Sequence, residues 1–280
     1  MDACSQIRAE FAYEVSSPAH FLLNLQVAPW EGQQLLSESL RVDPPVAMHS
    51  FCEPRNGNRF VRFDASPGPL AVRYGASVRR GPPLPPGRLA GLEEGLDEAP
   101  VNQVPDDVLP CLMASRYCES DLLGRVAQQL FGGLGPGIGR VQAICDWIHE
   151  SIAYQPGSTD STTTAREVFV QRAGVCRDFA HLGITLCRAL NIPARLVVAY
   201  VYFEEPPQDF HAVFEAWLGH RWVLFDATRM APVDRLVRVG TGRDAKDVAF
   251  STIFGAVRMS SMRISVSELP DEALAALSKQ

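Results

Sequence analysis

The chain has 280 residues, of which 46% are hydrophobic and 21% are charged, values typical of a soluble globular protein with a sizeable core. Its net charge of -6 provides no basic surface for DNA, RNA or anionic lipid, so we expect neither a nucleic acid nor a membrane as a partner. The seven cysteines lack C-x-x-C pairs and no signal peptide is evident, so we expect a reducing, cytoplasmic location.

Alternating apolar and polar side chains predict β-strands in residues 1–80. The alternation runs through Ile7–Val15, returns at Phe21–Val27 and appears again at Leu70–Val78. A period of two places each apolar set on one face of a sheet. An Asn-Gly pair at 56–57 is typical of a hairpin turn. Several short strands without a helical pattern predict a small all-β domain, either a sandwich or a barrel.

The segment 81–105 is rich in proline, which removes amide donors and disfavours helix. We interpret this segment as an ordered crossing or a linker between two domains. The sequence therefore predicts three parts: an N-terminal β domain over 1–80, a proline-rich linker over 81–105, and a second domain over 106–270.

Helical patterns begin after the linker. Ser120 or Asp121 can cap a first helix, which carries Leu122, Val126 and Leu130. Apolar side chains at helical spacing predict a second helix with a single apolar stripe, formed by Val141, Ile144, Cys145, Ile148 and Ile152.

Two further helices follow. Thr164 and Glu167 have the spacing of a capping box, which predicts the start of a short third helix. A fourth helix is expected from about Val175 to Leu190, because Pro193 follows and cannot continue it.

Strand-like runs then occupy 194–203, 210–218 and 221–227, with a tight turn expected at 219–220. The predicted order is therefore a β module, then helices, and then a helix followed by antiparallel strands. This order is expected of an α+β protein.

Cys176 stands at the predicted start of the fourth helix, directly after Gly174 and Val175. Free backbone amides and the helix dipole at this end favour a thiolate, and the amide of Cys176 itself can donate to an oxyanion. Gly174 allows the backbone to turn sharply before the nucleophile. A thiolate of this kind is a strong nucleophile that requires a nearby imidazole. A buried structural thiol is the alternative interpretation.

His181 is a poor candidate for a metal ligand. It follows Cys176 by five positions, which is about 140° around a helix, so the two side chains do not converge on one ion. No other cluster has zinc-like spacing, and we expect no metal site. Asp178 lies three positions before His181 and can pair with it, although a buried histidine with satisfied hydrogen bonds is the favoured interpretation.

His211 and Asp226 are candidates for a general base and the residue that orients it. His211 begins one predicted strand and Asp226 ends the next. If these strands pair around the turn at 219–220, the start of the first lies beside the end of the second. An aspartate beside a histidine fixes the tautomer and stabilises the imidazolium. A strand residue at a sheet edge and a cap of the turn at Thr228 are the structural alternatives.

Five segments carry a family resemblance: VQAICDWIHESIAY, GVCRDFAHL, NIPARLVVAYV, DFHAVFEAWL and RWVLFDAT. Over roughly residues 5–255 the chain resembles the bacterial transglutaminase-like superfamily, which includes proposed cysteine proteases. The resemblance implies a papain-like α+β core with Cys, His and Asp in this chain order, and so assigns catalytic roles to Cys176, His211 and Asp226. It implies no obligatory cofactor. No acidic loop corresponds to the calcium sites of animal transglutaminases.

The chemistry and the resemblance predict a thiol-dependent acyl-transfer enzyme that acts on the amide or peptide bonds of a peptide or protein substrate. Transfer of the acyl group from the thioester to water, which we favour, defines a cysteine protease or amidase. Transfer to an amine defines a protein-glutamine transglutaminase, and a non-catalytic peptide-binding scaffold is the third alternative. Tyr154 is a candidate to line the oxyanion site, with a packing aromatic as the alternative. The sequence leaves the oligomeric state open.

Overall fold

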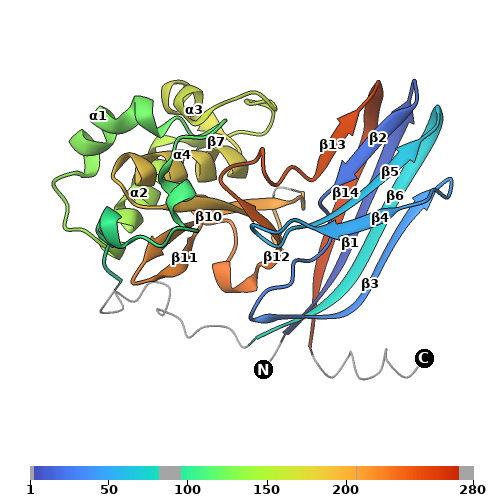
Figure 1. Ribbon diagram of the computed structural model, residues 1–280, viewed down its shortest axis with the longest axis horizontal. Helices are drawn as coiled ribbons and strands as arrows, with labels where there is room; N and C mark the ends of the chain where they lie inside the picture. The colour runs from blue at the N-terminus through green and yellow to red at the C-terminus, as the bar shows by residue number, and fades with distance from the viewer. Residues whose placement is uncertain (1–2, 82–95, 206, 271–280) are drawn as a thin grey trace.

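The structure, a computed structural model, describes residues 3–81, 96–205 and 207–270. Most of the predicted linker, residues 82–95, lies outside this description. Figure 1 shows two lobes, one made of long strands and the other of helices packed on a smaller sheet. We call them the β lobe and the helical lobe. The predicted α+β class is confirmed by this arrangement.

Within the described residues, the β lobe consists of two four-stranded antiparallel sheets. The first has the order β14-β1-β6-β3, with β1 at Ala3–Val15, β3 at Gln33–Asp43, β6 at Gly68–Arg80 and β14 at Val257–Pro270. The second has the order β13-β2-β5-β4, with β2 at Ala19–Leu23, β4 at His49–Cys52, β5 at Arg59–Ala65 and β13 at Ser251–Phe254.

The two sheets share one apolar core. Phe21 and Phe63 stack with their ring centroids 5.0 Å apart, and Tyr13 packs edge-on against Phe21 at 5.3 Å. Inward side chains alternate with outward ones along β5 and β6, as the period of two predicts. The predicted N-terminal β domain is confirmed, and it is a sandwich of two open sheets rather than a closed barrel.

Two strands of the β lobe come from the far end of the sequence. β13 pairs with β2, and β14 pairs with β1 along its whole length. Both strands fall inside the range 106–270 expected for the second domain, so the chain leaves the β lobe after β6 and returns to it after residue 250. The domain boundaries expected from the sequence stay a prediction.

The helical lobe is built on an antiparallel sheet with the order β11-β10-β9-β12. Its strands are β9 at Ala194–Tyr200, β10 at His211–Leu218, β11 at Arg221–Phe225 and β12 at Val237–Gly242. The turn predicted between β10 and β11 is present, because Gly219 and His220 both have positive φ values of 54° and 60° and Leu218 pairs with Arg221.

Helices of this lobe are α1 at Ser120–Phe131, α2 at Ile138–Ser151, α3 at Ala165–Gln171 and α4 at Cys176–Ala189. Short 3-10 turns lie at Val101–Gln103, Leu109–Leu112 and Val233–Arg235, and a two-residue parallel pair joins β7 at Ala153–Tyr154 to β8 at Ala173–Gly174.

Helix α4 lies directly on β10. A Cβ added to Gly183 would stand 2.5 Å from the Phe214 ring, so the absence of a side chain at 183 allows helix and strand to approach closely. The start of α4 lies near the start of β10, because Cys176 is within 3.8 Å of the backbone of Phe210.

The predicted features of these helices are partly confirmed. The apolar stripe of α2 is buried, and Thr164 and Glu167 form the expected reciprocal capping box at α3. The side chains named for α1 were the wrong face: Leu122 and Leu130 are exposed. The same helix instead buries Leu123, Ala127 and Phe131, which have the same spacing one residue along. Periodicity alone does not distinguish these two rows.

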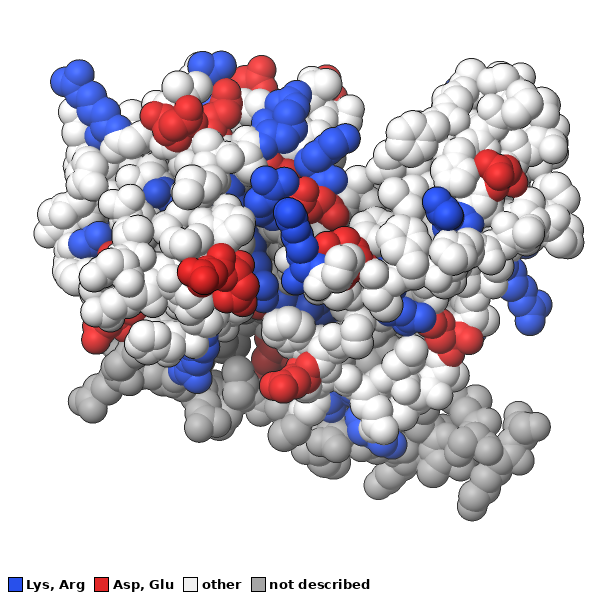
Figure 2. Space-filling model, viewed as in Figure 1, with Lys and Arg blue, Asp and Glu red and all other residues white. Residues whose placement is uncertain are grey.

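The two lobes are joined by buried contacts. The Tyr200 hydroxyl donates to the Leu25 carbonyl at 2.8 Å, and the Asn58 side chain exchanges two hydrogen bonds with the backbone of Thr241. On the face in Figure 2, Lys and Arg side chains gather where the lobes meet, with Asp and Glu beside them. No helix in the described ranges is both long and apolar enough to cross a membrane.

Candidate active site

The nucleophile candidate, Cys176, is the first residue of α4 and is partly buried. Val175 before it is extended and donates its amide to the Asp178 carboxylate at 2.9 Å, which fixes the first turn of the helix. A Cβ at Gly174 would lie 2.8 Å from the Cβ of Asp178, so glycine is required here for space. Gly174 has no positive φ, so the glycine serves close packing here and not an unusual backbone conformation.

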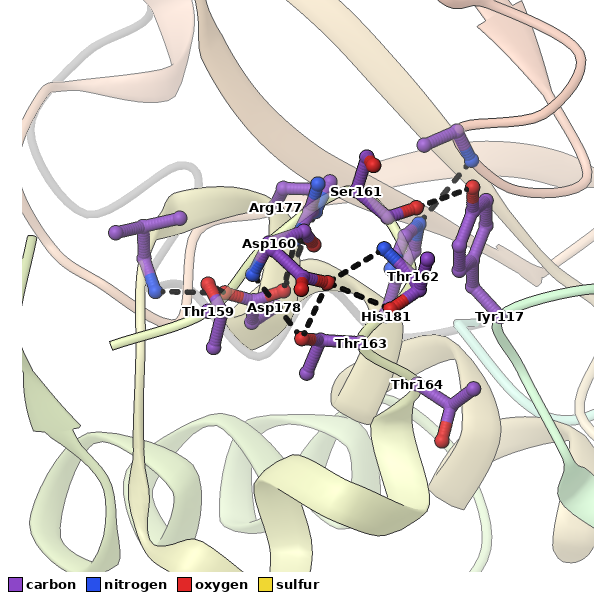
Figure 3. Close-up of polar contacts among 12 residues, drawn as sticks. Tyr117, Thr159, Asp160, Ser161, Thr162, Thr163, Thr164, Arg177, Asp178 and His181 are labelled. Atoms are coloured by element: carbon purple, nitrogen blue, oxygen red, sulfur yellow. Dashed lines mark hydrogen bonds and ion pairs between the residues drawn. The ribbon is translucent and has the colours of Figure 1, made fainter. Parts of the chain in front are cut away.

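Asp178 is fully buried and binds several donors, as Figure 3 shows. Besides the Val175 amide, the Thr159 hydroxyl donates to it at 2.6 Å and the Arg177 guanidinium at 3.0 Å. Arg177 also donates to the carbonyl of Asp160 at 2.6 Å. Asp178 therefore connects the loop around residue 160 to the start of α4. The sequence did not single it out for this role, although an acidic residue three positions after a helix cap is a recognisable signal.

His181 lies apart from this carboxylate. Its Nε2 accepts the Ala245 amide at 3.1 Å, and its ring stacks on Tyr117 with centroids 5.1 Å apart. Burial lowers the pKa of His181 to about 4, so the ring is neutral at pH 7. His181 is thus a buried structural histidine, and the pair with Asp178 suggested by their spacing is not formed.

His211 and Asp226 are neighbours across the β10–β11 hairpin. His211 Nε2 lies 2.8 Å from Asp226 Oδ2, and both side chains are almost completely buried. The other carboxylate oxygen, Oδ1, accepts the amide and the hydroxyl of Thr228 at 2.8 and 2.7 Å. Asp226 therefore caps the turn and orients the imidazole at the same time, and the two interpretations of this residue are compatible.

Cys176 completes the group. Its Sγ lies 3.8 Å from the carbonyl oxygen of Phe210, the residue before His211. Nδ1 of His211, the ring nitrogen that Asp226 leaves open, is buried and makes no well-aligned hydrogen bond with a described residue. Cys176 nevertheless interacts with this ring. The structure thus brings the three predicted residues together, and their catalytic roles stay a prediction.

The pKa of His211 depends strongly on Asp226 and Cys176. Burial acts to lower it, but the interactions with Asp226 and Cys176 outweigh burial and raise the pKa of His211 to about 10. The pKa of Asp226 is shifted the other way: burial would raise it, and the hydrogen bonds from His211 and Thr228 lower it overall. An imidazolium is therefore favoured between the carboxylate and the sulfur at neutral pH.

Tyr154 lies beside the nucleophile. It is in β7, which pairs with β8 immediately before Cys176. Burial raises the pKa of the Tyr154 hydroxyl, and both the side chain and the backbone amide of Cys176 act on it. Its ring also packs on Phe179 with centroids 5.9 Å apart. The residue is thus a packing aromatic whose hydroxyl lies near the amide expected to bind an oxyanion.

Side chains suited to a metal are not clustered here. The described part of the chain contains no group of three or more His, Cys, Asp or Glu side chains arranged to hold a metal ion.

Comparison with known proteins places this fold in a family. A family model for the transglutaminase-like superfamily matches residues 124–227, and one for the bacterial transglutaminase N-terminal domain matches residues 5–81. The crystal structure of a proposed cysteine protease from Cytophaga hutchinsonii is 40% identical, with a TM-score of 0.88, and the match covers 96% of this chain and 92% of that one. The chain belongs to the transglutaminase-like superfamily.

More distant sequence relatives are less informative. An uncharacterised protein of Mycobacterium leprae is 32% identical over 119 residues, 39% of this chain and 42% of that protein. One from Mycobacterium tuberculosis is 35% identical over 115 residues, 36% of this chain and 37% of that protein. The chain therefore spans about two fifths of the length of the curated relatives it matches.

Proposed function

We propose that this chain is a thiol-dependent acyl-transfer enzyme that hydrolyses amide or peptide bonds. The observation that carries the proposal is the environment of His211, a buried imidazole between the Asp226 carboxylate and Cys176 whose pKa is raised to about 10. A protonated imidazole beside a cysteine at a helix N-terminus is the arrangement that activates sulfur as a nucleophile. Similarity to a proposed cysteine protease supports the same class of reaction.

In the proposed first step, the Cys176 thiolate adds to the amide carbonyl carbon and the carbonyl electrons move to oxygen. The C–N bond then breaks, and the His211 imidazolium gives its proton to the departing amine. The acyl group remains on sulfur as a thioester and the ring is left neutral. Asp226 keeps the ring oriented through both states.

Hydrolysis then regenerates the enzyme. Water adds to the thioester while the neutral His211 ring accepts one of its protons. The C–S bond breaks, which releases the carboxylic acid and restores the thiolate and the imidazolium. The amide of Cys176 is a candidate donor to the oxyanion in both steps, and the nearby Tyr154 hydroxyl is a second candidate.

A mass-spectrometric search for the acyl-thioester tests the proposal. Brief incubation with p-nitrophenyl acetate, followed by acid quench and peptide mapping, should show an acetyl group on Cys176. Cys176→Ala should abolish this adduct, whereas Cys52→Ala, which alters an exposed cysteine on β4, should leave it unchanged. Acetylation of Cys52 but not of Cys176 would contradict the proposal.

The same thioester distinguishes the competing functions. Turnover on a peptide library in water supports a hydrolase, whereas efficient product formation only with an added amine indicates a transglutaminase. A peptide-binding scaffold would form no adduct at all. Iodoacetamide labelling provides a second measurement, because an activated cysteine is alkylated faster than an ordinary thiol. Cys176 should be alkylated faster than Cys52 in the same protein at neutral pH, and equal rates would favour the scaffold.

A further inference from the structure

A cavity of about 390 Å³ opens beside the candidate active site. Its lining includes Tyr154, whose hydroxyl lies next to Cys176, and Thr228, which donates to Asp226. A group bound in the cavity would therefore touch residues that surround both the nucleophile and the base. This shared lining makes the cavity a candidate for a substrate subsite.

Most of the wall is apolar. Ile152 after α2, Phe179 in α4 and Met230 in the loop after β11 join Tyr154 in lining it. Ile152 and Phe179 also belong to the buried core of the helical lobe, so this part of the wall is held by packing. The volume is near the lower end of the range for small-molecule sites, roughly 300–1,000 Å³, which suits a single long side chain.

One carboxylate at the cavity has no cationic partner. Glu205 lines it from the loop between β9 and β10, is exposed, and makes no ion pair or hydrogen bond with any described residue. Neither Lys nor Arg is among the lining residues, and His149 is the one basic side chain there. Arg229, which lies between two lining residues in the sequence, is already paired with Asp146.

Another acidic residue of the same loop lies near Tyr154. Asp209 keeps contact with solvent, yet the surrounding protein raises the pKa of its carboxyl, and the amide of Phe210 offsets this only in part. The negative charge of Asp209 contributes to the raised pKa of Tyr154, which places it near that wall of the cavity. Glu205 thus lines a mostly apolar cavity that has no Lys or Arg in its lining, and Asp209 adds negative charge near Tyr154.

We propose, on the basis of the hydrolase function proposed above, that this cavity binds a lysine or arginine side chain of the acyl-donor substrate next to the amide that is cleaved. The methylene stem would pack on the apolar wall while the cationic end reaches Glu205 at the solvent-exposed side. A neutral side chain of equal length gains the packing and leaves the carboxylate unpaired. An acidic side chain is repelled by Glu205 and Asp209.

The bound cation acts as an anchor and not as the acyl acceptor. An amine paired with a carboxylate stays protonated, so its nitrogen has no lone pair with which to attack a thioester. A cation held by Glu205 therefore fixes the acyl donor and leaves the second step to water.

Matched peptides test the assignment. Cleavage of a peptide library should show Lys and Arg enriched at one position flanking the cut. At that position, the wild type should have kcat/KM about two- to fivefold higher for lysine than for uncharged norleucine, because an exposed ion pair contributes little more than this. Glu205→Gln should remove this preference and Glu205→Lys should shift it toward glutamate. Glu204→Gln is the matched control, because Glu204 is the exposed neighbour that does not line the cavity, and it should retain the preference.

Two results would overturn the assignment. The first is an equal preference for lysine over norleucine in the wild type and in Glu205→Gln. The second is Glu205-dependent incorporation of free cadaverine into the product, which would show that the cavity holds an amine acceptor instead of a donor side chain. Glu205→Gln, Glu205→Lys and Glu204→Gln all alter exposed loop residues, so loss of folding does not complicate the comparison.

Acylation by a small neutral ester separates this inference from the proposed function. If p-nitrophenyl acetate acylates Cys176 and peptides are cleaved without regard to charge, the hydrolase stands and the cavity assignment is wrong. If neither the ester nor any peptide acylates Cys176, the hydrolase proposal is wrong and the cavity assignment is overturned with it.

Discussion

The middle of α4 and the β10–β11 hairpin each bury a histidine. The two histidines are equally buried but have opposite pKa shifts. His181 is 0% exposed and His211 is 1% exposed. The pKa of His181 is about 4, because burial dominates and its Nε2 meets only a backbone amide. The pKa of His211 is about 10, because Asp226 and Cys176 stabilise its charged form. Burial lowers the pKa of an imidazole and keeps it neutral, whereas acidic neighbours raise the pKa and keep the ring charged.

The largest contrast should appear when each histidine is removed. His211→Asn should lower turnover by about 10⁴-fold or more with the fold intact, because the proton donor and acceptor of the proposed reaction is lost. His181→Asn should leave turnover within a few-fold and cost about 1–3 kcal/mol of unfolding free energy, because the Ala245 amide loses its acceptor. Steady-state kinetics and urea unfolding of both variants measure this. Equal activity losses would break the distinction between the two sites.

Replacing Asp226 should make the environment of His211 more like that of His181. In Asp226→Asn the pKa of His211 should fall, because the hydrogen bond and charge that raise it are removed. The turnover number should fall by about 10²–10⁴-fold. Titration of the ring by NMR, read beside the kinetics, checks both. Thr228→Val is the milder control, since it removes one hydrogen bond to the carboxylate and spares the histidine.

The two histidines should also change the free energy of unfolding with pH in opposite directions. The lowered pKa of His181 contributes stability that is complete above pH 6.5 and is lost as pH falls through about 4, by up to roughly 3 kcal/mol. The raised pKa of His211 contributes stability that is complete below pH 6.5 and is lost as pH rises through about 10. Urea unfolding from pH 4 to 10 should show the acid slope weakened in His181→Asn and the alkaline slope weakened in His211→Asn. Unchanged slopes would argue against these environments.

The smallest expected effect concerns the start of α4. Asp178→Asn removes the charge that binds Arg177 and weakens the cap on the Val175 amide. The rate of Cys176 alkylation at neutral pH should fall by about tenfold, because the helix start that holds the sulfur is less well defined. Asp107→Asn, which alters an exposed aspartate in the turn before Leu109–Leu112, is the control and should change little. Identical rates for the two variants would show that Asp178 does not help to position Cys176.

Features of the fold and the site could be predicted from the sequence where they depend on residues close together in the chain. Cys176 at a helix start and the His211–Asp226 pair across a tight hairpin each follow from short-range pattern. The approach of Cys176 to that pair is a long-range contact, which only the family resemblance implied before the structure. The buried face of α1 could not be predicted, because Leu122 and Leu123 begin equally good helical rows and only packing on α4 selects one. The cavity at Glu205 was also beyond reach, since segments distant in the sequence build its walls.

The return of β14 to pair with β1 has a consequence for how the molecule is made. During synthesis on the ribosome, β1 and β2 emerge long before β14 and β13, the strands that complete their sheets. The nascent β lobe must wait with an incomplete edge while the whole helical lobe is translated, so premature termination before Ser251 would leave two sheets open to association with other chains.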